Sequence, residues 1–279
     1  MNALHALLFA VLQGATELFP VSSLGHAVLL RGLAGWNTDV GAPGFLPFLV
    51  MLHVGTSIAL LTYFRHDWVA IALGAFGLGN PDHTAQARRL VALIVTATIP
   101  ALILGFFLEK FFRSLFGSAS FAAIFLMLNG VLLISGESLR SRHAGHKPLS
   151  ELSFRDAFLI GCWQCLALIP GFSRSGATMV GGLLRGVDHE ASAHFSFLIA
   201  IPVIGAATVL EVPKLLHAGA GGATMGLAAL AALVAGGTSY LSTALLMRYF
   251  RDHDRASLNP FAFYCLALGL AGILLLHAR

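Results

Sequence analysis

A carboxylate, two hydroxyls and an imidazole stand close together near the N-terminus, at Glu17, Ser22, Ser23 and His26. Gln13 lies four residues before Glu17, so the two side chains share a face if this segment is helical. A proline after Glu17 ends that helix, and Ser22 or Ser23 can cap a following helix, whose first turn offers unpaired N–H groups to an anion. The segment therefore predicts acid–base groups beside an anion site.

A second cluster, around Arg174, has the residue types that bind phosphate oxygens. The guanidinium is a planar fork of donors that matches phosphate, and neighbouring glycines let backbone N–H groups approach a ligand. The candidate binding residues beside it are Gly171, Ser173, Ser175, Gly176 and Thr178. An alternative is that Arg174 only neutralises Glu17, although an ion pair alone would not require the surrounding glycines and serines.

Both clusters lie in a chain with the composition of a membrane protein. Hydrophobic residues make up 57% and charged residues 11% of the 279 residues, whereas soluble domains carry about 25% charged residues. The apolar runs are continuous and do not alternate with polar residues, which favours membrane helices over a β-barrel. The net charge of +4 is scattered over short connectors, so no nucleic-acid partner is expected.

Six segments have the length and hydropathy of membrane-spanning helices. These segments are residues 45–64, 90–108, 119–138, 192–211, 224–247 and 259–277. Two further apolar stretches, about 3–30 and 156–186, are interrupted by proline, serine and charged residues. Each is predicted to form a re-entrant hairpin of two short helices, with its loop covered by protein.

The predicted fold is an all-α polytopic membrane protein with an inverted-topology repeat. One membrane domain covers residues 1–279, with repeat 1 over about 1–138, a cytoplasmic connector over 139–155 and repeat 2 over about 156–279. Most Lys and Arg residues fall in the connectors on one side, which the positive-inside rule assigns to the cytoplasm. Both termini are then predicted to lie outside, and the two hairpins to point towards each other near the midplane.

One tempting metal motif fails on its spacing. His189 and His194 flank a glutamate as in zinc proteases, but they lie five residues apart instead of four. Five residues turn a helix through about 140°, so the two imidazoles do not share a face. No zinc site is expected there.

The quoted segments resemble the signatures of the undecaprenyl-diphosphate phosphatase family, also called the bacitracin-resistance family. The resemblance lies in Glu17 to His26 and Pro170 to Thr178, with further similarity at His53 to Thr56, Gly161 to Leu168 and Phe195 to Leu198. It implies hydrolysis of the C55 lipid undecaprenyl diphosphate to undecaprenyl phosphate on the outer face of the bacterial plasma membrane. Recycling of this carrier would serve peptidoglycan synthesis and confer bacitracin resistance.

The resemblance also implies roles for single residues. The expected catalytic residues are Glu17, Ser23, His26 and Arg174. Glu17, assisted by Gln13, would hold a divalent cation, Mg²⁺ or alternatively Ca²⁺, with waters and substrate oxygens completing its shell. Leu24 and Leu49 depart from the family pattern, which often has a threonine and an acidic residue at these positions.

Several alternatives stay open at this point. The nucleophile could be Ser23, His26 or a water. The oligomeric state, including a homo-oligomer, is not fixed by the sequence. Broken helices in inverted repeats also build secondary transporters, so a lipid-phosphate transporter that uses the same midplane site is the alternative function.

Overall fold

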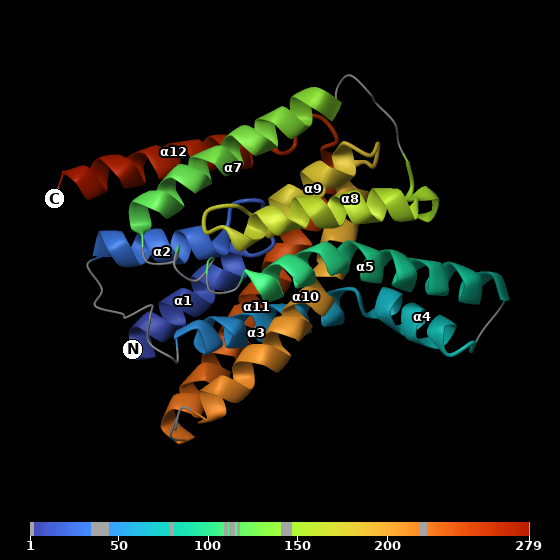
Figure 1. Ribbon diagram of the computed structural model, residues 1–279, viewed down its shortest axis with the longest axis horizontal. Helices are drawn as coiled ribbons and strands as arrows, with labels where there is room; N and C mark the ends of the chain where they lie inside the picture. The colour runs from blue at the N-terminus through green and yellow to red at the C-terminus, as the bar shows by residue number, and fades with distance from the viewer. Residues whose placement is uncertain are drawn as a thin grey trace.

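The computed structural model describes residues 3–34, 45–78, 81–108, 111, 115, 118–140, 147–217 and 222–278. Within these ranges the regular structure is helical, apart from one isolated bridge between Lys147 and Val187. Figure 1 shows most of the helices running roughly along one direction, with the start of α1 and the end of α12 at the same end of the bundle.

In the described part of the chain, five helices are long and apolar enough to cross a membrane. They are α5 (Pro81–Phe107), α7 (Ala119–Arg140), α10 (His189–His217), α11 (Gly222–Asp252) and α12 (Asn259–His277). A sixth span follows if α3 (Phe45–Tyr63) and α4 (Arg65–Ala75), which are bent by 81° at their junction, are taken as one. The chain is therefore an all-helical, multi-pass membrane protein.

The predicted spans lie within these helices, but several helices are longer than their apolar windows. Residues 65–89, between the first two predicted spans, contain α4 and the first residues of α5. Pro81 begins α5 and Asp82 lies in its first turn, which are favourable residues at a helix N-terminus. Hydropathy marks where a helix enters lipid, and the capping residues mark where it begins.

The two interrupted stretches each form short helices around a break. The first contains α1 (Ala3–Thr16) and α2 (Ser23–Ala34), and the second contains α8 (Phe154–Gln164), the 3₁₀ turn η2 (Cys165–Leu168) and α9 (Arg174–Leu183). Proline lies in both breaks, where it cannot continue a helix. Ser22 at φ 65° and Gly171 at φ 108° complete the two turns.

The two breaks pack against each other and against α7. Asn129 of α7 is fully buried; its amide N–H donates to the carbonyl of Pro20 at 2.9 Å, and its side-chain oxygen accepts from the Ser173 N–H at 3.0 Å. Ser175 donates to the carbonyl of Phe19 at 2.9 Å. Backbone groups freed by the breaks are thus satisfied by side chains from elsewhere, as an apolar surrounding requires.

Contacts between small residues bring the other helices close together. The α3–α11 contact is close, because a Cβ added at Gly55 would collide with the carbonyl oxygen of Ala232. Gly161 of α8 approaches the carbonyl of Ala97 of α5 in the same way. Small residues at such interfaces let membrane helices gain dispersion contacts that large side chains would prevent.

A polar network ties α7 to the start of α10 and to the α11–α12 turn. Arg140 donates to both carboxylate oxygens of Asp254 at 2.8 and 3.0 Å and to Nδ1 of His189 at 2.6 Å. The His189 proton then lies on Nε2, which donates to Glu137 at 2.7 Å, and Glu137 also accepts from the N–H of Leu258. Burial alone would raise the pKa of Asp254, but the adjoining His189 and Arg140 side chains more than offset it and lower that pKa. His194, which was considered with His189 as a zinc motif, contacts Asp67. The two histidines therefore have separate partners.

We expect Glu137→Ala to lower the free energy of unfolding by about 3 kcal/mol, because it leaves the His189 imidazole and the Leu258 N–H buried without an acceptor. Thermal unfolding of the purified protein in detergent measures the loss. Asp252→Ala is the control, since its pair with Arg248 is exposed at the surface and is worth less than about 1 kcal/mol. Equal losses in the two variants would contradict a structural role for the network.

Candidate active site

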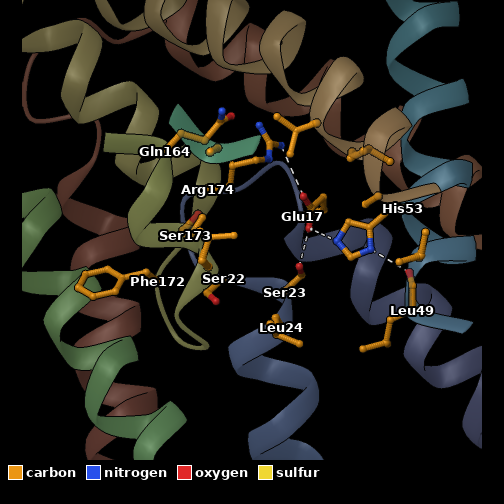
Figure 2. Close-up of a pocket in the computed structure, with 17 residues that line it drawn as sticks. Glu17, Ser22, Ser23, Leu24, Leu49, His53, Gln164, Phe172, Ser173 and Arg174 are labelled. Carbon is orange, nitrogen blue, oxygen red and sulfur yellow. Dashed lines mark hydrogen bonds and ion pairs between the residues drawn. The ribbon is translucent and has the colours of Figure 1, made fainter. Parts of the chain in front are cut away.

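A cavity of about 210 Å³ lies where the two breaks face α3 and α10. Its polar wall consists of Glu17, Ser22, Ser23, His53, Gln164, Ser173 and Arg174. The remaining wall is apolar and comes from α2, α3, α5, η2, the second break and α10. Figure 2 shows the polar side chains converging from several helices.

Glu17 is the polar centre of this cavity, although it is only 8% exposed. One carboxylate oxygen accepts hydrogen bonds from Ser23 at 2.5 Å and Gln13 at 2.9 Å and lies 3.4 Å from Nε2 of His53. The other oxygen lies 3.5 Å from the Arg174 guanidinium. Donors from four chain segments therefore surround a single buried acid.

Within the described part of the chain, Arg174 has one N–H group without a hydrogen-bond partner. One terminal nitrogen donates to the Ser196 carbonyl at 3.0 Å and the other to Glu17, while the buried Nε has no hydrogen-bond partner among the described residues. Arg174 is also the first residue of α9, whose N-cap is Ser173, so the positive end of a helix dipole adds to its charge. This part of the wall is suited to an anion.

The imidazole that contacts Glu17 belongs to His53. His26, the histidine that the sequence places nearest to Glu17 among the candidate residues, does not make this contact. His26 has both ring nitrogens engaged elsewhere, one with the Ser22 carbonyl at 2.6 Å and the other with the Tyr264 hydroxyl at 2.8 Å, and its ring stacks on Tyr264. His26 lies three residues after Ser23, but its side chain points towards Tyr264 of α12, whereas Ser23 lines the cavity. His26 therefore bonds groups other than Glu17, and its predicted catalytic role stays a prediction.

The remaining predicted binding residues mostly brace the cavity wall. The hydroxyls of Ser173 and Ser175 donate to the Phe19 carbonyl, and Thr178 bonds the Arg174 carbonyl and the Ser196 hydroxyl. Those that do not line the cavity are Gln13, Gly171, Ser175, Gly176 and Thr178. Their contacts fix the two breaks and so set where Glu17 and Arg174 lie.

Two wall residues, His53 and Gln164, were not among the predicted site residues. His53 lies within a predicted span, and an ionisable side chain there is a functional candidate by default. That signal could have found His53. Gln164 carries no charge, and its place in the family-like segment Gly161 to Leu168 is the one local signal that could have pointed to it.

The side chains at Glu17 fit a divalent cation only with oxygens from a ligand. Gln13 directs its amide N–H towards Glu17, which leaves the carboxylate as the one anionic ligand. The described residues contain no group of three or more His, Cys, Asp or Glu that could hold a metal. Mg²⁺ commonly binds through one or two carboxylates with waters and substrate phosphates, so an ion at Glu17 would take most of its ligands from those oxygens.

The family described as Bacitracin resistance protein BacA matches residues 6–271. The chain belongs to this family. It is 58% identical to the undecaprenyl-diphosphatase of Granulibacter bethesdensis, an alignment that covers 99% of this chain and 98% of the relative. It is also 54% identical to the undecaprenyl-diphosphatase of Acidiphilium cryptum, with 99% of each chain covered. The family resemblance predicted from the sequence is confirmed.

We expect Gly171→Ala to destabilise the protein by about 3 kcal/mol, because the break has no room for a side chain. A Cβ there would lie 2.6 Å from the Ala122 carbonyl oxygen, and its φ of 108° disfavours any L side chain. Gly186→Ala is the matched control, since Gly186 has a φ of 84° but open space around its Cβ position, and should cost about 1 kcal/mol. Thermal unfolding in detergent compares the two, and equal losses would exclude a steric role for the break.

Proposed function

We propose that this chain hydrolyses undecaprenyl diphosphate to undecaprenyl phosphate and inorganic phosphate. The observation that carries the proposal is the buried Glu17–Arg174 pair, with an unused Arg174 donor at a cavity. The name and close identity of the relatives supply the substrate. Recycling this carrier would serve peptidoglycan synthesis and bacitracin resistance.

In the proposed mechanism Arg174 and the start of α9 bind the terminal phosphate. Phosphoryl transfer needs little covalent help from the protein, so catalysis consists mainly of positioning and charge neutralisation. A divalent cation, Mg²⁺ or Ca²⁺, would supply further positive charge when bound by Glu17 and the diphosphate oxygens. Together these groups would hold the terminal phosphorus at the polar wall.

Glu17 is the proposed base of the site. The Ser23 hydroxyl already donates to it at 2.5 Å, which is the contact expected between a nucleophile and its base. A water at the same place could donate its proton to the same carboxylate. His53 would orient Glu17, and His26 would act indirectly by holding the first turn of α2 through the Ser22 carbonyl.

The apolar part of the cavity wall is the proposed start of the path for the C55 tail. Small and branched side chains from α3, α5, η2 and α10 form it, including Ala101, Val203 and Ala207. On α10 the residues beyond Ala207 reach lipid, since Val209 is 74% exposed. A prenyl chain leaving this wall would therefore pass directly from protein to bilayer.

An inverted repeat with two re-entrant hairpins is the proposed topology. The packing supports it, because α1 packs on α11 as α8 packs on α5. The polar contacts support it too: Glu17 contacts His53 of α3, and Arg174 contacts Ser196 of α10. In each half, the break is thus contacted by the next long helix along the chain. Both hairpins would enter the membrane without crossing it.

The proposed orientation places both termini and the mouth of the site on the periplasmic or extracellular side. It rests on the basic connectors, including Arg89, Arg155 and Arg251 on the other side. The same charge balance includes Lys110, Arg113 and Arg142, which lie outside the described residues. A homo-oligomer is compatible with this arrangement and is not required by it.

Lipid-phosphate transport is the second candidate, because broken helices that meet inside a bundle also form transporter sites. The two functions differ in what they need. Hydrolysis releases phosphate from protein in detergent, whereas transport requires a sealed membrane. The close contact between Ser23 and Glu17 favours hydrolysis, since binding alone does not need it.

We expect Arg174→Ala to reduce phosphate release from undecaprenyl diphosphate at least about a hundredfold, because the terminal phosphate loses its buried cation. Purified protein in detergent, assayed with and without a chelator, provides the measurement, and membrane insertion is checked in parallel. Arg251→Ala is the control, because Arg251 is exposed and far along α11. Turnover near that of the unmodified protein in Arg174→Ala would overturn the proposed phosphate site.

We expect Ala207→Phe to lower kcat/KM for undecaprenyl diphosphate about tenfold and to leave that for farnesyl diphosphate within about twofold, because a bulky ring blocks only the longer tail. Ala206→Phe is the matched control, since Ala206 is the preceding residue on α10 and does not line the cavity. Equal losses for both chain lengths would exclude this wall as the tail path.

A further inference from the structure

The Gln164 side chain has a buried oxygen with no partner. Gln164 ends α8, is only 2% exposed and lines the cavity that contains Arg174 and Glu17 (Figure 2). Its Oε1 makes no hydrogen bond to any described residue. A buried amide oxygen without a donor costs about 1–3 kcal/mol, so this position calls for an explanation.

The orientation of the amide follows from its other contact. The Gln164 Nε2 lies 3.4 Å from the carbonyl oxygen of Ala97, and a carbonyl oxygen can only accept. Rotating the amide by half a turn would place two oxygens against each other. The N–H₂ therefore faces α5, and Oε1 is the atom of this cavity-lining side chain that is left without a partner among the described residues.

This oxygen is unlike the other polar groups in the wall. Arg174, His53 and the serine hydroxyls can donate, and the acceptor Glu17 is already surrounded by donors. A phosphate group with all its oxygens unprotonated presents only acceptors, so it can bind the Arg174 Nε but not Gln164 Oε1. The group that Gln164 accepts from must carry a proton. Water is the reactant of diphosphate hydrolysis that does.

We propose that Gln164 is a positioning residue that accepts a hydrogen bond from the water consumed in the reaction. The inference rests on the proposed function. Gln164 Oε1 would hold this water against the phosphorus atom whose oxygens Arg174 binds, as a neutral amide that orients without removing a proton.

The reaction balances with this one water. Its oxygen forms a new P–O bond to the terminal phosphorus, the bond to the bridging oxygen breaks, and that electron pair goes to undecaprenyl phosphate. The released orthophosphate takes up the water's protons or passes them to solvent. If Ser23 attacks first, its proton passes to Glu17 and undecaprenyl phosphate leaves with the bridging oxygen. The same water then attacks the phosphoserine, and the Ser23 oxygen leaves and takes up a proton again.

Gln164→Met tests the assignment, because it keeps the length of the side chain and removes the acceptor. We expect kcat for undecaprenyl diphosphate to fall about thirtyfold, with the inhibition constant of inorganic phosphate within about twofold. Added methanol gives a second readout. Without its positioned water the variant should transfer more phosphoryl group to methanol, and the ratio of methyl phosphate to inorganic phosphate should rise.

Two further variants separate positioning from packing. Gln86→Met is the matched control on the exposed surface of α5. It should leave kcat, the inhibition constant of phosphate and the product ratio in methanol unchanged. Gln164→Glu keeps an acceptor but loses the N–H₂ that faces Ala97. It should keep a higher kcat than Gln164→Met, with a raised KM because a second carboxylate repels the diphosphate.

The outcomes are distinct. A kcat within about threefold in Gln164→Met, or an unchanged product ratio in methanol, would overturn the assignment. A lower unfolding temperature together with weaker phosphate inhibition, shared by the Met and Glu variants, would show that Gln164 only joins α8 to α5. If the unmodified protein releases no phosphate from undecaprenyl diphosphate, the proposed function fails first, and the role of Gln164 fails with it.

Discussion

One buried ion pair constrains the rest of the structure. Glu17 and Arg174 belong to segments more than 150 residues apart, and neither side chain is more than about a tenth exposed. An isolated charge in such a place costs several kcal/mol or more, and a lone pair of charges recovers only part of that cost. Additional donors and acceptors must therefore be held around both residues. The Gln13 amide, the Ser23 hydroxyl, His53 and the Ser196 carbonyl do this.

Holding those groups requires irregular backbone inside an apolar bundle, which raises a second cost. A helix satisfies its own N–H and C=O groups, whereas a break leaves several of them without partners. Here the side chains of Asn129, Ser175 and His26 bond the freed groups of Pro20, Phe19 and Ser22. Many of the polar residues in the two motifs therefore support the backbone instead of facing the cavity. They are as necessary to the site as the residues that line it.

Local sequence was sufficient to predict the two breaks and the ionisable residues within them. Glu17 and Arg174 stand out because charge is rare in apolar stretches, and Pro20 and Pro170 mark where helices must end. The same information could not identify which imidazole reaches Glu17. His26 is close in sequence, but the helix that carries it also packs beside α12, where Tyr264 takes its second nitrogen. His53 reaches Glu17 because α3 lies against α1, which is a matter of tertiary packing.

The division of the charges between the two halves explains why those halves interlock. The first half supplies the acid and the second supplies the cation, so either half alone would bury an uncompensated charge. The halves also pack crosswise, with α1 against α11 and α8 against α5, and α7 lies against α12. Each break is therefore held partly by helices of the other half, and the cavity forms only when both are in place. Because small residues such as Gly55 and Gly161 set these contacts at close range, a shift of one helix would change the position of the carboxylate relative to the guanidinium. The precision of the site thus resides in the interface between the halves as much as in the residues of the cavity wall.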